Sequence, residues 1–195
     1  MKIVVLVVFA FLTISCKEKG PSYDSQEDIN KKITQNKPFF DFDEVVHYEF
    51  SIPTKEYEDL ILVETLSEKG KFLSILLGDP CPETHEEKIR FKEALESVDK
   101  VENNINPKNY NKLRNQIFSE KKCDDTWAYA CVPIYRDIFI FKKNKKETGM
   151  AKICFECQLF SISNKDADTE CFNMNGELDG LRKIIVENKK NKKNK

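Results

Sequence analysis

Glycine, histidine and tryptophan are scarce in this sequence of 195 residues, which holds six glycines, two histidines and one tryptophan. With so few glycines, the chain has no glycine-rich loop of the kind that cradles phosphate groups in nucleotide-binding proteins. The two histidines, His47 and His85, have no neighbouring Ser, Asp or Cys pattern typical of a catalytic triad. We expect both histidines at the surface. The sequence therefore predicts no cofactor and does not point to an enzyme.

A hydrophobic segment long enough to span a bilayer is also missing. The apolar run Ile3 to Ile14 has only Thr13 as a polar residue, but it holds twelve residues, whereas a spanning helix needs about 20. Lys2 precedes the run. A short positive start followed by a short apolar core and small residues is typical of an N-terminal signal peptide. We interpret residues 1–15 in this way.

The signal peptide ends in Thr13-Ile14-Ser15-Cys16, which resembles the lipobox of bacterial lipoproteins. The resemblance implies that a lipid such as palmitate is attached to the sulfur of Cys16 and that a peptidase cuts before this residue. Several acyl chains anchor a protein stably without a spanning helix. In a bacterium with two membranes, an Asp directly after the lipidated cysteine resembles a signal for retention in the inner membrane. Lys17 stands at this position instead, which favours the outer membrane. The alternative is an ordinary cleaved signal in which Cys16 has no role.

Charge and polarity divide the rest of the chain into three parts. Residues 16–38 are polar and have the composition of a flexible tether. Residues 17–187 carry 26 basic and 33 acidic side chains, a net charge of −7, which does not suit nucleic acid but suits a basic protein partner. Residues 188–195 carry five lysines and no acid. We expect them to be a disordered tail, the alternative being a contact with anionic lipid or polysaccharide.

Apolar patterns between residues 39 and 187 predict several strands. Alternation predicts a strand over 45–52, and a short apolar run predicts a buried strand over 72–78. Two longer strands are expected over 133–141, with apolar residues on both faces, and over 149–162. Asn144-Lys145 would form the turn of the hairpin between them.

Capping residues and helical spacing predict the helices. They are expected after Thr54, from Thr84 with Glu87 completing a capping box, from Asn106-Pro107, and over 176–188. The sequence therefore predicts one α+β domain over 39–187, with a mainly antiparallel sheet and flanking helices.

Six cysteines remain besides Cys16, and their even number in an exported domain favours structural disulfides. They are Cys81, Cys123, Cys131, Cys154, Cys157 and Cys171. If the hairpin turns at Asn144-Lys145, Cys131 comes close to Cys157, so we predict a bridge between these two. The pairing of the other four is left open.

The C-x-x-C spacing of Cys154-Phe-Glu-Cys157 is also typical of a thiol-redox centre, or of a zinc site that would include Cys123 and Cys131. Residues three apart on a strand point to opposite faces, and Cys154 lies with Lys152 on the polar face. This geometry argues against both alternatives. The zinc or redox site therefore stays the second hypothesis, and no metal is expected.

The stretch from Cys131 to Cys157 resembles a family of uncharacterised bacterial exported proteins in which a hairpin ends in Ile-Cys-Phe-x-Cys. The resemblance implies a shared small domain and no particular activity. We therefore expect a membrane-anchored lipoprotein of the cell envelope that acts by binding a protein partner, as small inhibitors do, or by structural support.

Overall fold

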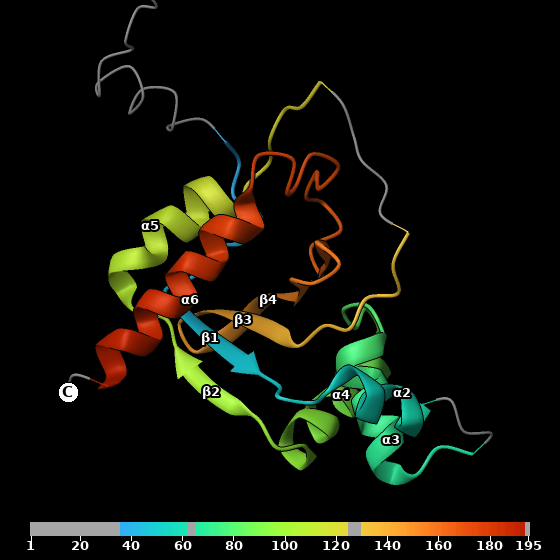
Figure 1. Ribbon diagram of the computed structural model, residues 1–195. Helices are drawn as coiled ribbons and strands as arrows, with labels where there is room; N and C mark the ends of the chain where they lie inside the picture. The colour runs from blue at the N-terminus through green and yellow to red at the C-terminus, as the bar shows by residue number, and fades with distance from the viewer. Residues whose placement is uncertain (1–35, 62–64, 125–129, 194–195) are drawn as a thin grey trace, which may run out of the picture. The chain divides into compact units, whose positions relative to one another are not determined.

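Five strands form one antiparallel sheet in the computed structural model, which describes residues 36–61, 65–124 and 130–193 (Figure 1). The strand order is β2-β1-β3-β4-β5. The strands are β1 (Glu44–Glu49), β2 (Val101–Asn104), β3 (Asp137–Lys143), β4 (Lys146–Cys154) and β5 (Leu159–Ile162). The predicted α+β class with a mainly antiparallel sheet and flanking helices is confirmed.

Helices precede and follow the strands of this sheet. The first group is α2 (Thr54–Ile61), α3 (Glu68–Leu73), the π-helical turn η2 (Ser74–Gly78) and α4 (His85–Ser97). The second group is η3 (Pro107–Asn109), α5 (Tyr110–Lys112), η4 (Leu113–Ile117) and the C-terminal helix α6 (Glu177–Lys193).

Two helix starts have the caps that the sequence predicts. The Thr84 hydroxyl accepts a hydrogen bond from the Glu87 N–H, and the Glu87 carboxylate accepts one from the Thr84 N–H, which completes the capping box of α4. The side-chain oxygen of Asn106 accepts a hydrogen bond from the Lys108 N–H. These bonds satisfy N–H groups that the first turn of a helix leaves without a partner.

Both faces of the sheet are covered by helices. Phe139 and Ile153 pack on one face with α6 and η4, whereas Ile138 and Met150 pack on the other face with α3, η2 and α4. Figure 1 shows α5 and α6 together on one side of the sheet and α2, α3 and α4 grouped on the other. The expectation that the strand ending at Phe141 has apolar residues on both faces is confirmed.

The hairpin between β3 and β4 turns at the predicted residues. Asn144 and Lys145 have φ values of 50° and 64°, as a two-residue turn of type I′ requires. A register shift next to Phe141 places Gly149 opposite it. The ring of Phe40 stacks on Phe141 and lies so close to Gly149 that a side chain at this position would collide with it.

The buried strand predicted over 72–78 is wrong, because these residues end α3 and form η2. Leu73, Leu76 and Leu77 are buried, and their spacing of i, i+3 and i+4 places them on one face of a helix. A short apolar run does not separate a helix from a buried strand by its period.

The single strand predicted over 149–162 is also wrong. β4 ends at Cys154, the four residues Phe155–Gln158 form a loop, and β5 begins at Leu159. The strand predicted from 133 begins only at Asp137. The chain just before it bonds elsewhere, because the Tyr135 N–H donates to the carbonyl of Leu77 at the end of η2.

The C-terminal boundary lies beyond the predicted one. α6 runs to Lys193, so the prediction of a disordered tail from residue 188 is wrong for residues 188–193. Asn188 is buried, and its side-chain amide accepts a hydrogen bond from the Asn106 N–H and donates one to the Asn104 carbonyl. Lys192 also donates hydrogen bonds to β2, to the Glu102 carbonyl and to the side-chain oxygen of Asn103, so the polar composition of this helix end conceals its attachment to the sheet.

The N-terminal boundary lies slightly before residue 39. Pro38 forms an isolated bridge with Ser119, and the carbonyl of Lys37 accepts a hydrogen bond from the Glu120 N–H. Residues 37 and 38, expected in the tether, therefore belong to the domain.

Candidate functional site

Four of the six cysteines form two disulfides. Cys123 is bonded to Cys171 with a Cα–Cα distance of 5.6 Å, and Cys131 to Cys157 with a distance of 5.9 Å. The second pair is the one that the hairpin register predicts. Its bond nevertheless joins two loops rather than two strands, because Cys131 precedes β3 and Cys157 follows β4.

The other two cysteines, Cys81 and Cys154, are free and buried, so the expectation of bridges for all six is wrong for this pair. The alternative zinc set is also wrong. Cys123 is bonded to Cys171, away from the other three members of the set, and the described residues hold no group of three or more side chains suited to a metal ion.

The loop between β4 and β5 places the two cysteines of the C-x-x-C pair side by side. Cys154 is the last residue of β4, and Cys157 lies in the loop, whose last residue Gln158 has a φ of 57°. The Cys157 N–H donates a hydrogen bond to the sulfur of Cys154 over 3.4 Å. The two cysteines therefore do not diverge as residues three apart on a continuous strand do, and the prediction that they diverge is wrong.

Lys152 is the second unusual residue of this region. Its side chain has no exposed surface, although the sequence pattern places it on a polar face of β4. Its Nζ donates to the backbone carbonyls of Ile75 at 3.0 Å, of Pro80 at 3.5 Å and of Asp79. These carbonyls lie at and after the C-terminal end of η2, where the helix dipole favours a positive charge. Nothing in the sequence around Lys152 signals this role.

Burial sets the chemistry of the groups around Lys152. It lowers the pKa of the Lys152 ammonium to about 8 and raises the pKa of the nearby Cys81 thiol. The Cys81 sulfur donates to the Ser161 carbonyl over 3.2 Å, and the ring of Tyr135 lies 5.2 Å from the Lys152 Nζ. Because the reactive form of cysteine is the thiolate, this thiol is poorly suited to act as a nucleophile at neutral pH.

A cavity of about 280 Å³ borders this cluster. Ile75, Asp79 and Pro80, which hold Lys152, line it together with Cys81 and Phe91. Lys152 itself is not part of the lining. We interpret Lys152 as a structural residue that holds the end of η2 through its hydrogen bonds to these backbone carbonyls.

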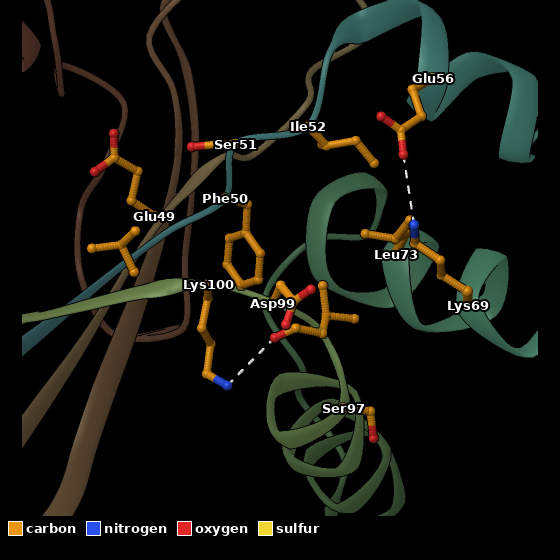
Figure 2. A pocket seen from close by; sticks show the side chains of 12 residues that line it. Glu49, Phe50, Ser51, Ile52, Glu56, Lys69, Leu73, Ser97, Asp99 and Lys100 are labelled. Atoms are coloured by element: carbon orange, nitrogen blue, oxygen red, sulfur yellow. Dashed lines mark hydrogen bonds and ion pairs between the residues drawn. The ribbon is translucent and has the colours of Figure 1, made fainter.

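A larger groove of about 560 Å³ lies between the end of β1, α3 and the segment that joins α4 to β2. Figure 2 shows the Phe50 ring in its centre, with Glu56 and Lys69 on one side and Asp99 and Lys100 on another. Glu56 and Lys69 form an ion pair over 3.6 Å. The groove is lined by Glu49, Phe50, Ser51, Ile52, Glu56, Lys69, Leu73, Ser97, Val98, Asp99, Lys100 and Val101.

Charge is divided between the two faces of the sheet. Residues 53–61 and 65–100, which hold α2, α3, η2 and α4, carry eleven acidic and seven basic side chains, a net charge of −4. Residues 106–122 and residues 177–192 of α6, on the opposite face, together carry ten basic and four acidic side chains, a net charge of +6. We call these the acidic layer and the basic layer. The groove has α3 and the end of α4 as walls and therefore lies in the acidic layer.

The surface position expected for His47 is wrong. Its side chain is fully buried, its Nε2 lies 2.7 Å from the Asp137 carboxylate, and its ring stacks on Phe139 at 4.6 Å. His47 is buried because both faces of β1 are covered, so that even a polar side chain on this strand does not reach solvent. His85 is exposed at the start of α4, as expected.

The predicted signal peptide, Cys16 and most of the tether lie outside the described residues. Within the part of the chain that the structure describes, no helix has the length and apolar character needed to cross a membrane. No protein-family model, curated protein or solved structure matches this chain.

Proposed function

We propose that this chain is a lipoprotein of the cell envelope, anchored through lipid on Cys16, whose domain binds a basic segment of a protein partner. The lipobox-like end of the signal peptide supports the anchor, and Lys17 in place of Asp favours the outer membrane. The polar residues between Cys16 and the domain supply a tether that lets the domain reach a partner.

The division of charge across the sheet is the observation that carries the binding function. Partner recognition often pairs surfaces of opposite charge, which speeds association and suppresses wrong partners. The acidic layer contains the groove, whose apolar floor of Phe50, Ile52 and Leu73 is bordered by the carboxylates of Glu56 and Asp99. A lysine- or arginine-rich segment with an apolar side chain suits this combination.

A peptide-binding measurement tests the proposal. A fluorescent peptide of alternating lysine and leucine is titrated with the exported protein, and its anisotropy is recorded at low and high salt. We expect the double variant Glu56→Lys/Asp99→Lys to bind about tenfold more weakly than the wild type at low salt, and the difference to shrink at high salt because ions screen exposed charges.

The double variant Asp124→Lys/Glu170→Lys is the matched control. Both residues are exposed and do not line the groove, and the change in net charge is the same. This control should bind within about twofold of the wild type. Equal weakening in both variants would show that net charge alone attracts the peptide and would refute a binding site in the groove.

A further inference from the structure

We propose that Cys154, Cys157 and Cys131 form a thiol–disulfide exchange site, which presents Cys131 to a disulfide of another molecule. This inference is independent of the binding function above. One free thiol lies beside one disulfide bridge at this site. Cys154 is free, Cys157 is bonded to Cys131, and the Cys157 N–H donates to the Cys154 sulfur over 3.4 Å.

The loop geometry allows a bond between Cys154 and Cys157. Hairpin loops of four residues are most often built around a type I turn, in which the Cα atoms of the first and fourth residues lie within about 7 Å. Bonded cysteines have Cα atoms about 4.4–6.8 Å apart. A turn that starts at Cys154, the last residue of β4, has Cys157 as its fourth residue, so the two cysteines can pair without any change in the register of β4 and β5.

The exchange step conserves atoms and electrons. The Cys154 thiolate attacks the sulfur of Cys157, a Cys154–Cys157 bond forms, and the Cys131–Cys157 bond breaks. Cys131 leaves as a thiolate and takes up the proton that Cys154 gave up. One disulfide is exchanged for another, so this step needs no oxidant or reductant.

Exposure decides which sulfur meets an external molecule. Cys154 has 1% of its surface exposed, whereas Cys131 is exposed and precedes β3 in the segment between η4 and that strand. An external disulfide therefore encounters Cys131. In the second step the Cys131 thiolate attacks one sulfur of that disulfide, a mixed disulfide forms, and the other half leaves as a thiol.

Glutathione disulfide is a suitable probe for this site. The processed, exported chain is incubated with it under native conditions, quenched with acid, and mapped by peptide mass spectrometry, which assigns each adduct to its cysteine. We expect a glutathione adduct on Cys131 together with a new Cys154–Cys157 bridge. The amount of adduct should fall at least about tenfold in Cys154→Ala, because no thiol remains to release Cys131.

Cys81→Ala is the matched control, since it removes the other buried free thiol. It should form the same adduct as the wild type. An equal adduct on Cys131 in Cys154→Ala would overturn the proposal, as would an adduct on Cys154 with the Cys131–Cys157 bond intact.

The wild-type map provides a test that needs no variant. Detection of peptides joined through Cys154 and Cys157 supports the exchange. Recovery of the Cys131–Cys157 bridge alone, with no adduct on Cys131 after prolonged incubation, would refute it.

Discussion

Lys152 shows how a charged side chain can lie in an interior without an acidic partner at contact distance. Its ammonium donates to three backbone carbonyls around the end of η2, which replace the hydrogen bonds that water would supply. Aromatic rings of Phe91 and Tyr135 lie 5.8 Å and 5.2 Å from its Nζ. The burial still disfavours the charged form and lowers the pKa to about 8, from an ordinary value of 10.5. Protonation of this one residue is therefore coupled to folding.

The stability of the domain should rise with pH through Lys152. Between pH 8 and 10.5 the unfolded chain holds a proton on this lysine that the folded chain has lost, so raising the pH favours folding. From pH 7 to 9.5 we expect the free energy of unfolding of the wild type to increase by about 2 kcal/mol relative to Lys152→Met. Urea unfolding at several pH values measures this difference.

The comparison between variants is needed because other groups titrate in the same range. Burial raises the pKa of Tyr57, which lowers stability as the pH rises, but this group is present in both proteins. Lys71→Met, a change at an exposed lysine, serves as the control and should run parallel to the wild type. If Lys152→Met also runs parallel to the wild type, the coupling of Lys152 to folding is wrong.

At the scale of the elements, local signals were sufficient for some boundaries. The caps at Thr84 and Asn106 and the turn at Asn144-Lys145 depend on residues within four positions of one another, and all three were predicted. The strands predicted over 72–78 and 149–162 are wrong for another reason. The apolar residues of 72–78 fit a helix as well as a strand, and those of 149–162 fit two strands as well as one. Only contacts with distant elements select between these structures.

The same dependence on distant contacts explains why the burial of Lys152 and Cys154 could not be predicted from the sequence. The polar face of β4 was visible, but that α3, η2 and α4 cover it was not, so Lys152 and Cys154 were placed on the polar side of a strand. The Cys131–Cys157 pair was predicted because the hairpin turn places both residues near one end of the sheet. Cys81 lies beside β5, where its N–H donates to the Ser161 hydroxyl, and no local pattern encodes this position.

Two glycines provide a test of packing at this scale. A methyl group at Gly149 would collide with the Phe40 ring, which is held by its stack on Phe141 in the core. At Gly180 in α6 the same methyl would meet only the end of the Ile117 side chain at 2.8 Å. We expect Gly149→Ala to lower the free energy of unfolding by about 2–3 kcal/mol.

Gly180→Ala should change the free energy of unfolding by less than about 1 kcal/mol, because the gain in helix propensity offsets a small shift of Ile117. Chemical denaturation of both variants measures the two effects. Similar losses in both would mean that the approach of Phe40 to β4 is not the reason for glycine at 149.

At the scale of the whole molecule, the small net charge hides a separation of charge. The chain as a whole carries −1, yet the acidic layer and the basic layer differ by ten charges and cover opposite faces of one sheet. Composition could give the sign of the body but not this division, because it depends on which helices pack on which face. The groove lies on the acidic side of this division.

The anchor is the remaining property of the whole molecule that an experiment should decide. If Cys16 carries acyl chains, a fatty acid label supplied to the producing bacterium should appear in the wild-type protein, and the protein should partition into the detergent phase. Cys16→Ser removes the sulfur that forms the lipid bond, so we expect the label to be lost. Cys81→Ser, which changes a buried thiol of the domain, should keep it. Label that persists in Cys16→Ser, or that never enters the wild type, would leave an ordinary signal peptide as the correct interpretation of residues 1–15.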